Sequence, residues 1–384
     1  MKKYSEIISI ILFCAIIASL SVSFVISKDI PFSEQENREL AQAPSLDRES
    51  FFSGEFGKEM NLYFSDQFPL RSLFVNIKSM TELAFLKGEN NGVLFSQNQL
   101  AVKNFNSYQS RINITENTDR IYPETIKAQL LSVNALAEKL NIPLVTVIPP
   151  RTVDIADSVF KYDRPDGDTA FNLMKDTLSD KTGYINTLDL LRPKYENGEY
   201  VYYRTDHHWT TLGAYYTYCE IMKNLGHGEN IIPITDFEIE QVSDFSGTTA
   251  ARASFPFYEK DTLELWHLSD ENDYEVTVDG EKLDSFYSRD FLDKSDKYSV
   301  FLDGTHDITE IRKKGEERKT LLIAKDSFAN CLIPFLAREF DIIALNLRTN
   351  TAISAFAENY SADAVLIVFN TENIITSADL GNVR

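Results

Sequence analysis

Residues 321–328 read LLIAKDSF, and this stretch decides the fold. Four apolar residues lead into the polar turn Lys325-Asp326-Ser327, and a helical pattern follows over 328–337. A strand, a sharp turn and a helix in this order are typical of the carboxyl edge of a parallel sheet, where backbone N–H groups lie beside the turn. Ser327 is therefore a candidate nucleophile, although Asp-Ser before a helix is also a common helix cap.

The apolar pattern on either side predicts an α/β domain. Residues 124–140 carry apolar side chains at helical spacing, and 142–148 is a β-branched run typical of a parallel strand buried on both faces. Further strands are predicted at 342–345 and 364–369. The sequence therefore predicts a three-layer α/β sandwich with a parallel sheet.

Residues 235–318 have a different pattern. Alternating segments such as 274–278 and 298–302, each next to an Asp-Gly pair, predict antiparallel hairpins. We expect this stretch to be a β-rich insertion in an α/β domain that spans 121–384.

A second polar cluster, YYRTDHHWT at residues 202–210, contains two of the five histidines in the chain. Asp206 and His208 on a loop at the same sheet edge as Ser327 would supply the orienting carboxylate and the general base for that serine. A metal site at Asp206, His207 and His208 is not expected, because adjacent side chains in an extended loop point apart and no further His or Cys cluster follows.

Other residues near these strand ends are candidates for substrate contacts. Arg151 and Arg204 could orient a polar or anionic substrate or pair with acidic neighbours, since arginines at strand carboxyl ends often line the crevice. Trp209 could pack under the loop or stack on a sugar.

The N-terminus predicts export. Residues 7–26 are uncharged, and this stretch is as long as a bilayer-spanning helix. It follows Lys2 and Lys3, which would hold its start in the cytoplasm. A signal anchor and a cleaved signal peptide both fit residues 1–27. A spacer is expected at 28–50 and a helical lead-in at 51–120.

Charge and cysteine content exclude several classes of partner and cofactor. The net charge of -20 argues against a nucleic-acid partner, which would require clustered Lys and Arg. Cys14, Cys219 and Cys331 form neither a disulfide framework nor a zinc pattern, and no cofactor is expected.

The motif Thr205-Asp206-His207-His208-Trp209-Thr210 resembles the signature of the DHHW family. These exported bacterial proteins resemble the acetyltransferase domains of the alginate O-acetylation machinery, within the SGNH-hydrolase superfamily. Three N-terminal segments are also similar to the family pattern: Glu36-Asn37-Arg38, Asp66-Gln67-Phe68-Pro69-Leu70-Arg71 and Gly92-Val93-Leu94-Phe95. The resemblance therefore spans nearly the whole chain.

The resemblance implies a permuted SGNH-type triad in which an Asp-x-His pair precedes the serine, here Asp206, His208 and Ser327. Lys325 stands where a glycine is usual. His207 occupies the variable position between the acid and the base, where it would line the substrate or be structural.

An oxyanion hole would use the backbone N–H of Ser327 and Asn370, which falls where the superfamily's asparagine block would lie. Arg348, in the loop after 342–345, is a further candidate for substrate contact.

The expected function is an exported serine-dependent O-acyltransferase or esterase that moves or removes acetyl groups on a cell-envelope polysaccharide. Its partners would be the acylated carbohydrate, a membrane acyl-donor protein and the membrane itself, through the N-terminal helix. The protein would be extracytoplasmic, either anchored or secreted. The alternative is a catalytically inactive carbohydrate-binding or assembly protein of the cell envelope.

Overall fold

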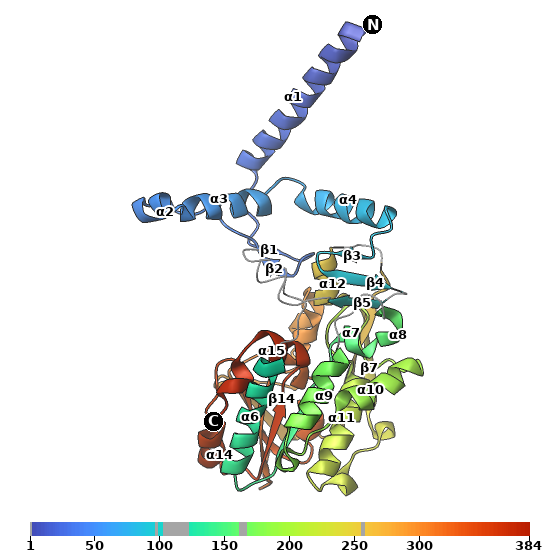
Figure 1. Ribbon diagram of the computed structural model, residues 1–384, viewed down its shortest axis with the longest axis vertical. Helices are drawn as coiled ribbons and strands as arrows, with labels where there is room; N and C mark the ends of the chain where they lie inside the picture. The colour runs from blue at the N-terminus through green and yellow to red at the C-terminus, as the bar shows by residue number, and fades with distance from the viewer. Residues whose placement is uncertain (1, 97–98, 103–122, 161–166, 255–257) are drawn as a thin grey trace. The chain divides into compact units, whose positions relative to one another are not determined.

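The computed structural model describes residues 2–96, 99–102, 123–160, 167–254 and 258–384 (Figure 1). The described residues up to Lys87, together with Ser254, form one compact unit, and those from Gly88 onward form a second. The candidate catalytic residues all belong to the second unit.

The first unit contains the predicted apolar N-terminal helix. Within α1 (Lys2–Ile26), residues 4–26 are long and apolar enough to cross a membrane, judged by length and composition. The elements that follow are β1 (Phe32–Ser33), β2 (Arg38–Glu39), α2 (Arg48–Ser53), α3 (Glu55–Asp66) and α4 (Arg71–Ala84).

Ion pairs connect the short β1–β2 hairpin to the joint between α3 and α4. Arg38 donates to both carboxylate oxygens of Asp66 at 2.9 and 2.6 Å, and Arg71 pairs with Glu36. Asp66 is buried, so this bidentate pair is shielded from solvent and favours one geometry. Two of the three N-terminal segments that resemble the family pattern therefore contact each other.

A seven-stranded mixed sheet forms the core of the second unit, with strand order β10-β9-β11-β13-β12-β14-β6. The last four strands of that order pair in parallel, and the first three join antiparallel. The bounds are β6 (Leu144–Val147), β9 (Tyr274–Val278), β10 (Glu281–Leu283), β11 (Ile308–Lys313), β12 (Thr320–Lys325), β13 (Asp341–Asn346) and β14 (Ala364–Val368).

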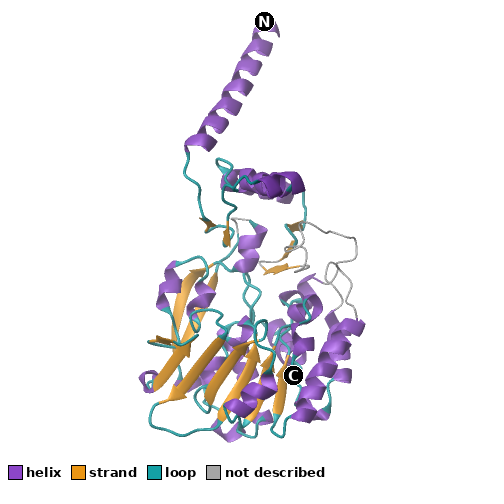
Figure 2. Cartoon of the chain, turned by 90° about the vertical axis from the view of Figure 1, so that its left-hand side faces the viewer, coloured by secondary structure: helices purple, strands orange, loops and turns teal. Residues whose placement is uncertain are grey.

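Helices flank this sheet and complete the predicted three-layer α/β arrangement (Figures 1 and 2). Strands β12 and β14 are buried along nearly their whole length, as expected of parallel strands covered on both faces. The helices are α6 (Pro123–Lys139), α7 (Thr152–Ile155), α8 (Asp157–Phe160), α9 (Gly167–Thr177), α10 (Thr187–Glu196), α11 (Thr211–Asn224), α12 (Thr248–Ala253), α13 (Ile333–Leu336), α14 (Ile353–Asn359) and α15 (Thr371–Thr376).

The strand register brings the carboxyl ends of the parallel strands to one level. Lys325 of β12 lies opposite Asn346 of β13 and Val368 of β14, and Val368 lies opposite Val147 of β6. The loops that follow these four strands therefore emerge at the same sheet edge, as parallel pairing requires.

The region 235–318 is rich in strands, but it does not form a separate layer. β7 (Glu238–Phe245) and β8 (Asp261–His267) pair as a two-stranded sheet, whereas β9, β10 and β11 extend the main sheet. The strand predicted at 298–302 is wrong: residues 297–300 form a 3-10 helix, because Tyr298 turns toward the candidate site.

The chain after α4 returns to β structure. β3 (Glu89–Asn90), β4 (Val93–Ser96) and β5 (Gln99–Val102) form a three-stranded antiparallel sheet in the second unit. The helical segment expected at 51–120 therefore ends at Ala84, and residues 103–122 lie outside the described part of the chain.

Candidate active site

The loop of residues 202–210 is held at the sheet edge by a buried carboxylate. Asp261 accepts hydrogen bonds from the backbone N–H groups of Arg204 at 2.9 Å and Thr205 at 2.7 Å. An isolated bridge between Tyr202 and Trp209 closes the loop. These contacts bend the chain tightly between the two ends of the loop.

The turn after β12 is organised by Asp326, which is also buried. Its carboxylate accepts from Phe328 N at 3.0 Å and from Asn370 N at 2.7 Å. It thereby caps the 3-10 helix that begins at Ser327 and ties this turn to the loop after β14. Lys325, at the position where a glycine is usual, keeps its side chain buried and donates to Asn330 Oδ1 at 2.7 Å.

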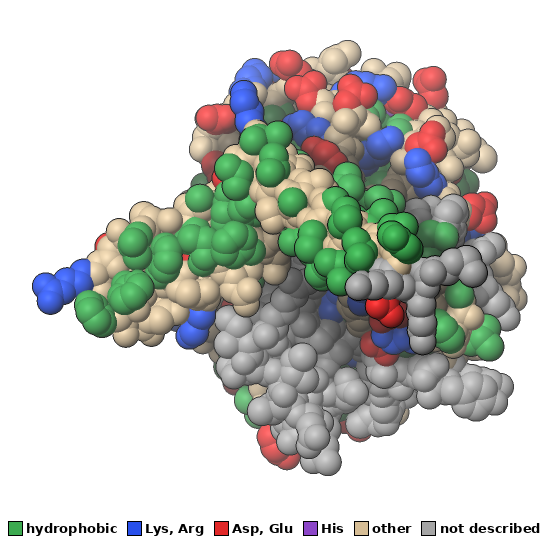
Figure 3. Space-filling model, turned by 90° about the horizontal axis from the view of Figure 1, so that it is seen from above, with side chains coloured by type: hydrophobic (Ala, Val, Ile, Leu, Met, Phe, Trp, Pro, Cys, Tyr) green, Lys and Arg blue, Asp and Glu red, His purple; other side chains and the backbone are tan. Residues whose placement is uncertain are grey.

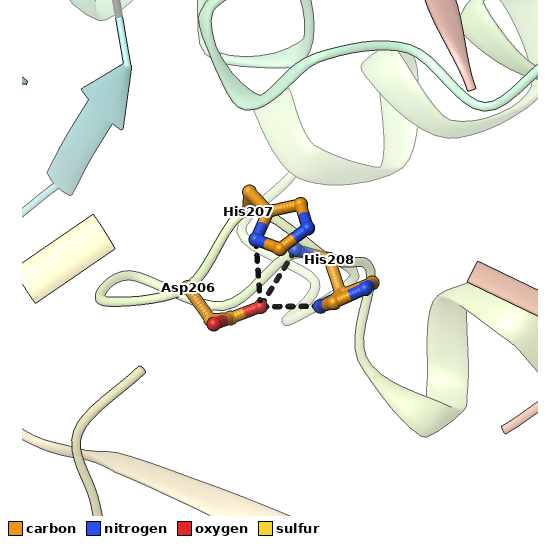
Figure 4. A group of neighbouring side chains, drawn as sticks. All are labelled: Asp206, His207 and His208. Carbon is orange, nitrogen blue, oxygen red and sulfur yellow. Dashed lines mark hydrogen bonds and ion pairs between the residues drawn. The ribbon is translucent and has the colours of Figure 1, made fainter. Parts of the chain in front are cut away.

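The structure brings Asp206, His208 and Ser327 into one hydrogen-bonded chain. His208 Nε2 lies 2.8 Å from Ser327 Oγ, and His208 Nδ1 lies 2.6 Å from Asp206 Oδ1. Figure 4 shows the contacts of Asp206 with both histidines. With the proton on Nδ1 shared with Asp206, Nε2 faces the serine hydroxyl as an acceptor, which is the geometry of a serine nucleophile with its base and orienter.

Asp206 is held from its other side by the start of α12. Thr248 donates to Asp206 Oδ2 from its backbone N at 2.8 Å and from its hydroxyl at 2.9 Å. Burial alone would raise the pKa of Asp206, but His207, His208 and the hydrogen bonds from His208 outweigh burial and hold that pKa well below its usual range. Asp206 is therefore a carboxylate at neutral pH.

Gly247 leaves room for Asp206. A Cβ atom at Gly247 would lie 2.3 Å from Asp206 Cβ, much closer than a van der Waals contact. We expect Gly247→Ala to displace Asp206 and to lower kcat/KM by about 10²-fold, because small shifts of catalytic groups are costly. Steady-state kinetics on an activated acetyl ester would measure the loss.

Gly88→Ala is the matched control for this variant. A Cβ atom there meets nothing within 4 Å, so activity should be retained. Full activity of Gly247→Ala would show that Asp206 does not need its present position.

Tyr298 is a site residue that the sequence did not reveal. Its ring stacks on His208 with ring centroids 3.8 Å apart and an interplanar angle of 6°, and its hydroxyl donates to Cys331 Sγ at 3.3 Å. Burial raises the pKa of Tyr298, so the hydroxyl stays protonated. Tyr298 therefore fixes the plane of the His208 ring. A lone tyrosine 90 residues from the motif carries no local signal of that role.

His207 lies beside His208 instead of pointing away from it. The expectation that these adjacent side chains point apart, used above against a metal site, is therefore wrong. The loop bends here, and the two imidazole rings have centroids 3.8 Å apart. The ligand atoms of Asp206, His207 and His208 fall within 4.8 Å of one another. However, His207 Nδ1 lies 2.8 Å from Thr248 Oγ1, and both oxygens of Asp206 already accept hydrogen bonds, so these atoms are engaged within the protein.

The pKa of His207 is lowered to about 3, by burial first and then by the neighbouring His208. His207 is thus neutral at physiological pH. Its side chain is partly exposed, and it lines a small pocket beside the residue that follows the serine. That pocket is lined by Val102, Pro150, Arg151, His207, Phe328, Asn370 and Glu372.

Asn370 also lines this pocket. Its Nδ2 donates to Asp326 Oδ2 at 2.8 Å, and its Oδ1 accepts from Asn373 N at 3.0 Å as the cap of α15. One of the two hydrogens on Nδ2 is used in this way, so the amide has a second one to donate.

The three candidate arginines have different surroundings. Arg151 lines the pocket, but its guanidinium donates to both carboxylate oxygens of Asp154 at 2.8 Å and contacts Glu372 at 3.5 Å. Burial alone would lower the pKa of Arg151, but these two carboxylates outweigh burial and raise it. Arg151 is thus fixed in place before any substrate arrives.

The other two arginines are more exposed. Arg348 donates to Asn373 Oδ1 at 3.1 Å, and its charge contributes to the lowered pKa of His207, which places it near the site. Arg204 lies 3.7 Å from Glu259 and over the ring of Tyr200. Neither is among the described residues that line the pocket.

Trp209 packs beneath the nucleophile turn. It is 0% exposed, and its Nε1 donates to Phe328 O at 3.0 Å. A fully buried indole offers no face to a sugar, so the packing interpretation holds and the stacking interpretation is corrected. Trp209 instead joins the histidine loop to the serine turn.

Comparison with known proteins gives one family match and several solved structures of similar fold. Residues 122–345, which include all three triad residues, match a family model described as DHHW protein. None of the curated proteins compared with the sequence matches it.

Solved structures share the fold at low sequence identity. A DHHW family protein from Eubacterium siraeum is 19% identical with a TM-score of 0.58, and the match covers 77% of this chain and 95% of that one. Bacillus cereus PatB1 is 18% identical with a TM-score of 0.59, covering 75% and 98%. PatB1 with a sulfonyl adduct is 19% identical with a TM-score of 0.58, covering 68% and 92%.

Proposed function

Because this chain belongs to the DHHW family, we propose that it is an exported serine-dependent O-acyltransferase or esterase that acts on acetyl groups of a cell-envelope polysaccharide. The observation that carries the proposal is the hydrogen-bonded chain from Ser327 Oγ through the His208 ring to Asp206. A binding or assembly protein would not need a carboxylate, an imidazole and a hydroxyl in this order at these distances.

In the first half of the reaction, Ser327 Oγ attacks the acetyl carbonyl carbon while His208 Nε2 accepts the hydroxyl proton. The tetrahedral intermediate then collapses, the bond to the departing oxygen breaks, and His208 returns its proton to that oxygen. Asp206 stays ionised and stabilises the imidazolium form of His208 between the two proton transfers. The product is an acetyl ester on Ser327.

In the second half, a hydroxyl group attacks the acetyl ester on Ser327. His208 removes the proton of that hydroxyl and then gives a proton to Ser327 Oγ as the ester bond breaks. A sugar hydroxyl as the acceptor completes a transfer, and water completes a hydrolysis. The same three residues serve both outcomes.

The oxyanion of each tetrahedral intermediate needs donors that are already in place. We assign this role to the backbone N–H of Ser327 and to Asn370. Asp326 supports the assignment, because it binds the loops of both residues at once. His207, Arg151 and Arg348 are proposed to line the path of the carbohydrate.

We propose that α1 is an uncleaved anchor that holds the enzyme at the outer side of the membrane. Its outer end is part of the folded first unit, because the ring of Phe24 packs against Tyr63 and Phe64 of α3 with centroids 5.5 and 5.2 Å apart. Cleavage after Phe24 would detach this ring from the first unit.

A covalent adduct tests the proposal directly. Aryl sulfonyl fluorides react with activated serines, and one of the PatB1 structures similar to this chain holds a sulfonyl adduct. We expect such a reagent to modify Ser327 with a single mass increment, which peptide mass spectrometry would locate. His208→Ala should slow the labelling by about 10²-fold or more, because the hydroxyl then lacks its base.

The same measurement can disprove the assignment. Adduct formation on a different serine, or equal labelling rates in the wild type and His208→Ala, would contradict the role given to Ser327.

A further inference from the structure

Large apolar side chains are exposed in the first unit far more often than in the second. Among the described residues from 88 onward, only Leu131, Ile234 and Ile239 are exposed large hydrophobics. The short segment 48–87 has twelve: Phe51, Phe52, Leu62, Phe64, Phe68, Leu70, Leu73, Phe74, Ile77, Met80, Phe85 and Leu86. Apolar exposure of this density marks an interaction surface.

These side chains gather on the faces of helices. In α4, Leu73, Phe74, Ile77 and Met80 recur at helical spacing along one exposed stripe, while Ser79 on the opposite side is buried. Phe64, Phe68 and Phe74 line an open groove with the nearby helix residues. Figure 3, seen from the side of the N-terminal helices, shows hydrophobic side chains collected over this part of the molecule.

The same helices are connected to the outer end of α1. Besides the packing of Phe24 on α3, the Tyr63 hydroxyl donates to Asp29 at 3.0 Å. Gln67 bonds both backbone groups of Ile30, accepting from the N–H and donating to the carbonyl at 2.9 Å each. The end of α3 is therefore held within a few residues of the point where the apolar helix stops at Ile26.

We propose that α2, α3 and α4 form an interfacial platform that lies in the outer lipid–water boundary of the membrane, with its apolar side chains inserted among the lipids. This inference rests on the proposed membrane anchor. An amphipathic helix beside a span can insert its apolar face to the level of the headgroups, and aromatic side chains favour that level.

The charge of the segment indicates what kind of lipid surface it fits. Residues 48–87 contain five basic and five acidic residues, so their net charge is zero, although the whole chain carries -20. The platform is thus not repelled by a membrane, and it has no excess of basic residues that would require anionic lipids. Insertion is driven by apolar burial, and phosphatidylcholine alone provides a sufficient surface.

Tryptophan fluorescence of the full chain in phosphatidylcholine vesicles tests the platform. Both native tryptophans, Trp209 and Trp266, are buried and give a constant background. Phe74→Trp reports from the apolar stripe of α4, and Ser72→Trp, at an exposed position outside that stripe on the same helix, is its matched control. Ile16→Trp reports from the middle of α1.

We expect lipids brominated near the carbonyl end of their acyl chains to quench Phe74→Trp at least about threefold more than Ser72→Trp. Ser72→Trp should instead be accessible to iodide in the water. Ile16→Trp should be quenched best by lipids brominated deep in the chain. Adding phosphatidylglycerol should leave this pattern unchanged.

The three reporters separate the two possible failures. If Ile16→Trp is quenched but Phe74→Trp is not quenched more than Ser72→Trp, the anchor stands and the platform is wrong, and another protein covers the apolar stripe. If Ile16→Trp is not quenched, the anchor fails and the platform fails with it. Neither result depends on the serine chemistry of the second unit.

Discussion

Replacing Ser327 with alanine is expected to lower kcat/KM for an activated acetyl ester by about 10⁴-fold, because the covalent route is lost and only the binding site and oxyanion donors remain. Release of the leaving group, followed spectroscopically, measures the loss. Adduct formation by the sulfonyl reagent should disappear in the same variant. This variant removes the oxygen that lies 2.8 Å from His208 Nε2, so the base loses the hydroxyl that it would deprotonate.

The fold should survive this change. The Ser327 side chain is only partly buried, and its loss removes one hydrogen bond, worth about 1 kcal/mol, so Tm should fall by no more than about 2 °C. Ser132→Ala is a suitable control, because Ser132 on α6 loses its hydroxyl hydrogen bonds, to Gly381 O at 2.9 Å and Ala128 O at 3.4 Å, but should keep full activity. An active Ser327→Ala protein would reject the nucleophile assignment.

The grouping of Asp206, His208 and Ser327 was predictable because these residues stand in segments that carry local chemical signals. LLIAKDSF shows a buried strand that ends in a polar turn, and Asp206-His207-His208 places scarce histidines next to a carboxylate. The rule that parallel strands end at a common edge supplied the geometry between them. The resemblance to the DHHW signature implied the same pairing of His208 with Ser327.

The supporting residues were not predictable, because their contacts come from distant parts of the chain. Gly247 and Thr248 contact Asp206 although they are more than 40 residues away in the sequence. Asp261, which binds the start of the loop, is still more distant in the sequence. Tyr298 lies in a segment whose alternating pattern favours a strand, but its stacking on His208 selects a 3-10 turn. Tertiary packing decides such cases over local propensity.

The orientations of His207 and Trp209 could not be predicted from the sequence alone. Neighbouring residues in an extended chain point to opposite faces, which predicts that His207 and His208 diverge. The bend between Tyr203 and Thr210 brings both rings onto Asp206 instead. The aromatic ring of Trp209 could stack on a sugar, but it is 0% exposed and its ring nitrogen donates to Phe328 O, so it packs inside the protein.

Replacing Asp206 with asparagine should be nearly as damaging as removing the nucleophile, with kcat falling by roughly 10³- to 10⁴-fold and KM almost unchanged. An asparagine amide can donate a hydrogen bond to His208 Nδ1, which moves the ring proton to Nε2. That nitrogen then faces Ser327 Oγ as a donor and can no longer accept the proton. Steady-state kinetics from pH 6 to 9 would record the loss.

A proton resonance distinguishes this mechanism from simple loss of structure. The Asp206–His208 hydrogen bond is 2.6 Å long, so its Nδ1 proton should give a strongly downfield NMR signal in the wild type and none in Asp206→Asn. Thr248→Ala is the graded control, because it removes the hydroxyl hydrogen bond to Asp206 Oδ2 but keeps the backbone hydrogen bond and leaves His208 in place. It should keep the downfield signal and lose only about tenfold in rate.

The acid dependence of stability gives an independent check on the Asp206 carboxylate. The folded pKa of Asp206 lies below its unfolded value near about 4, so the carboxylate stabilises the fold above that pH and loses this contribution as pH falls. Asp206→Asn lacks the contribution at every pH. The difference in unfolding free energy between the wild type and the variant should therefore shrink between about pH 5 and 2. A difference that stays constant would show that folding does not lower the pKa of Asp206.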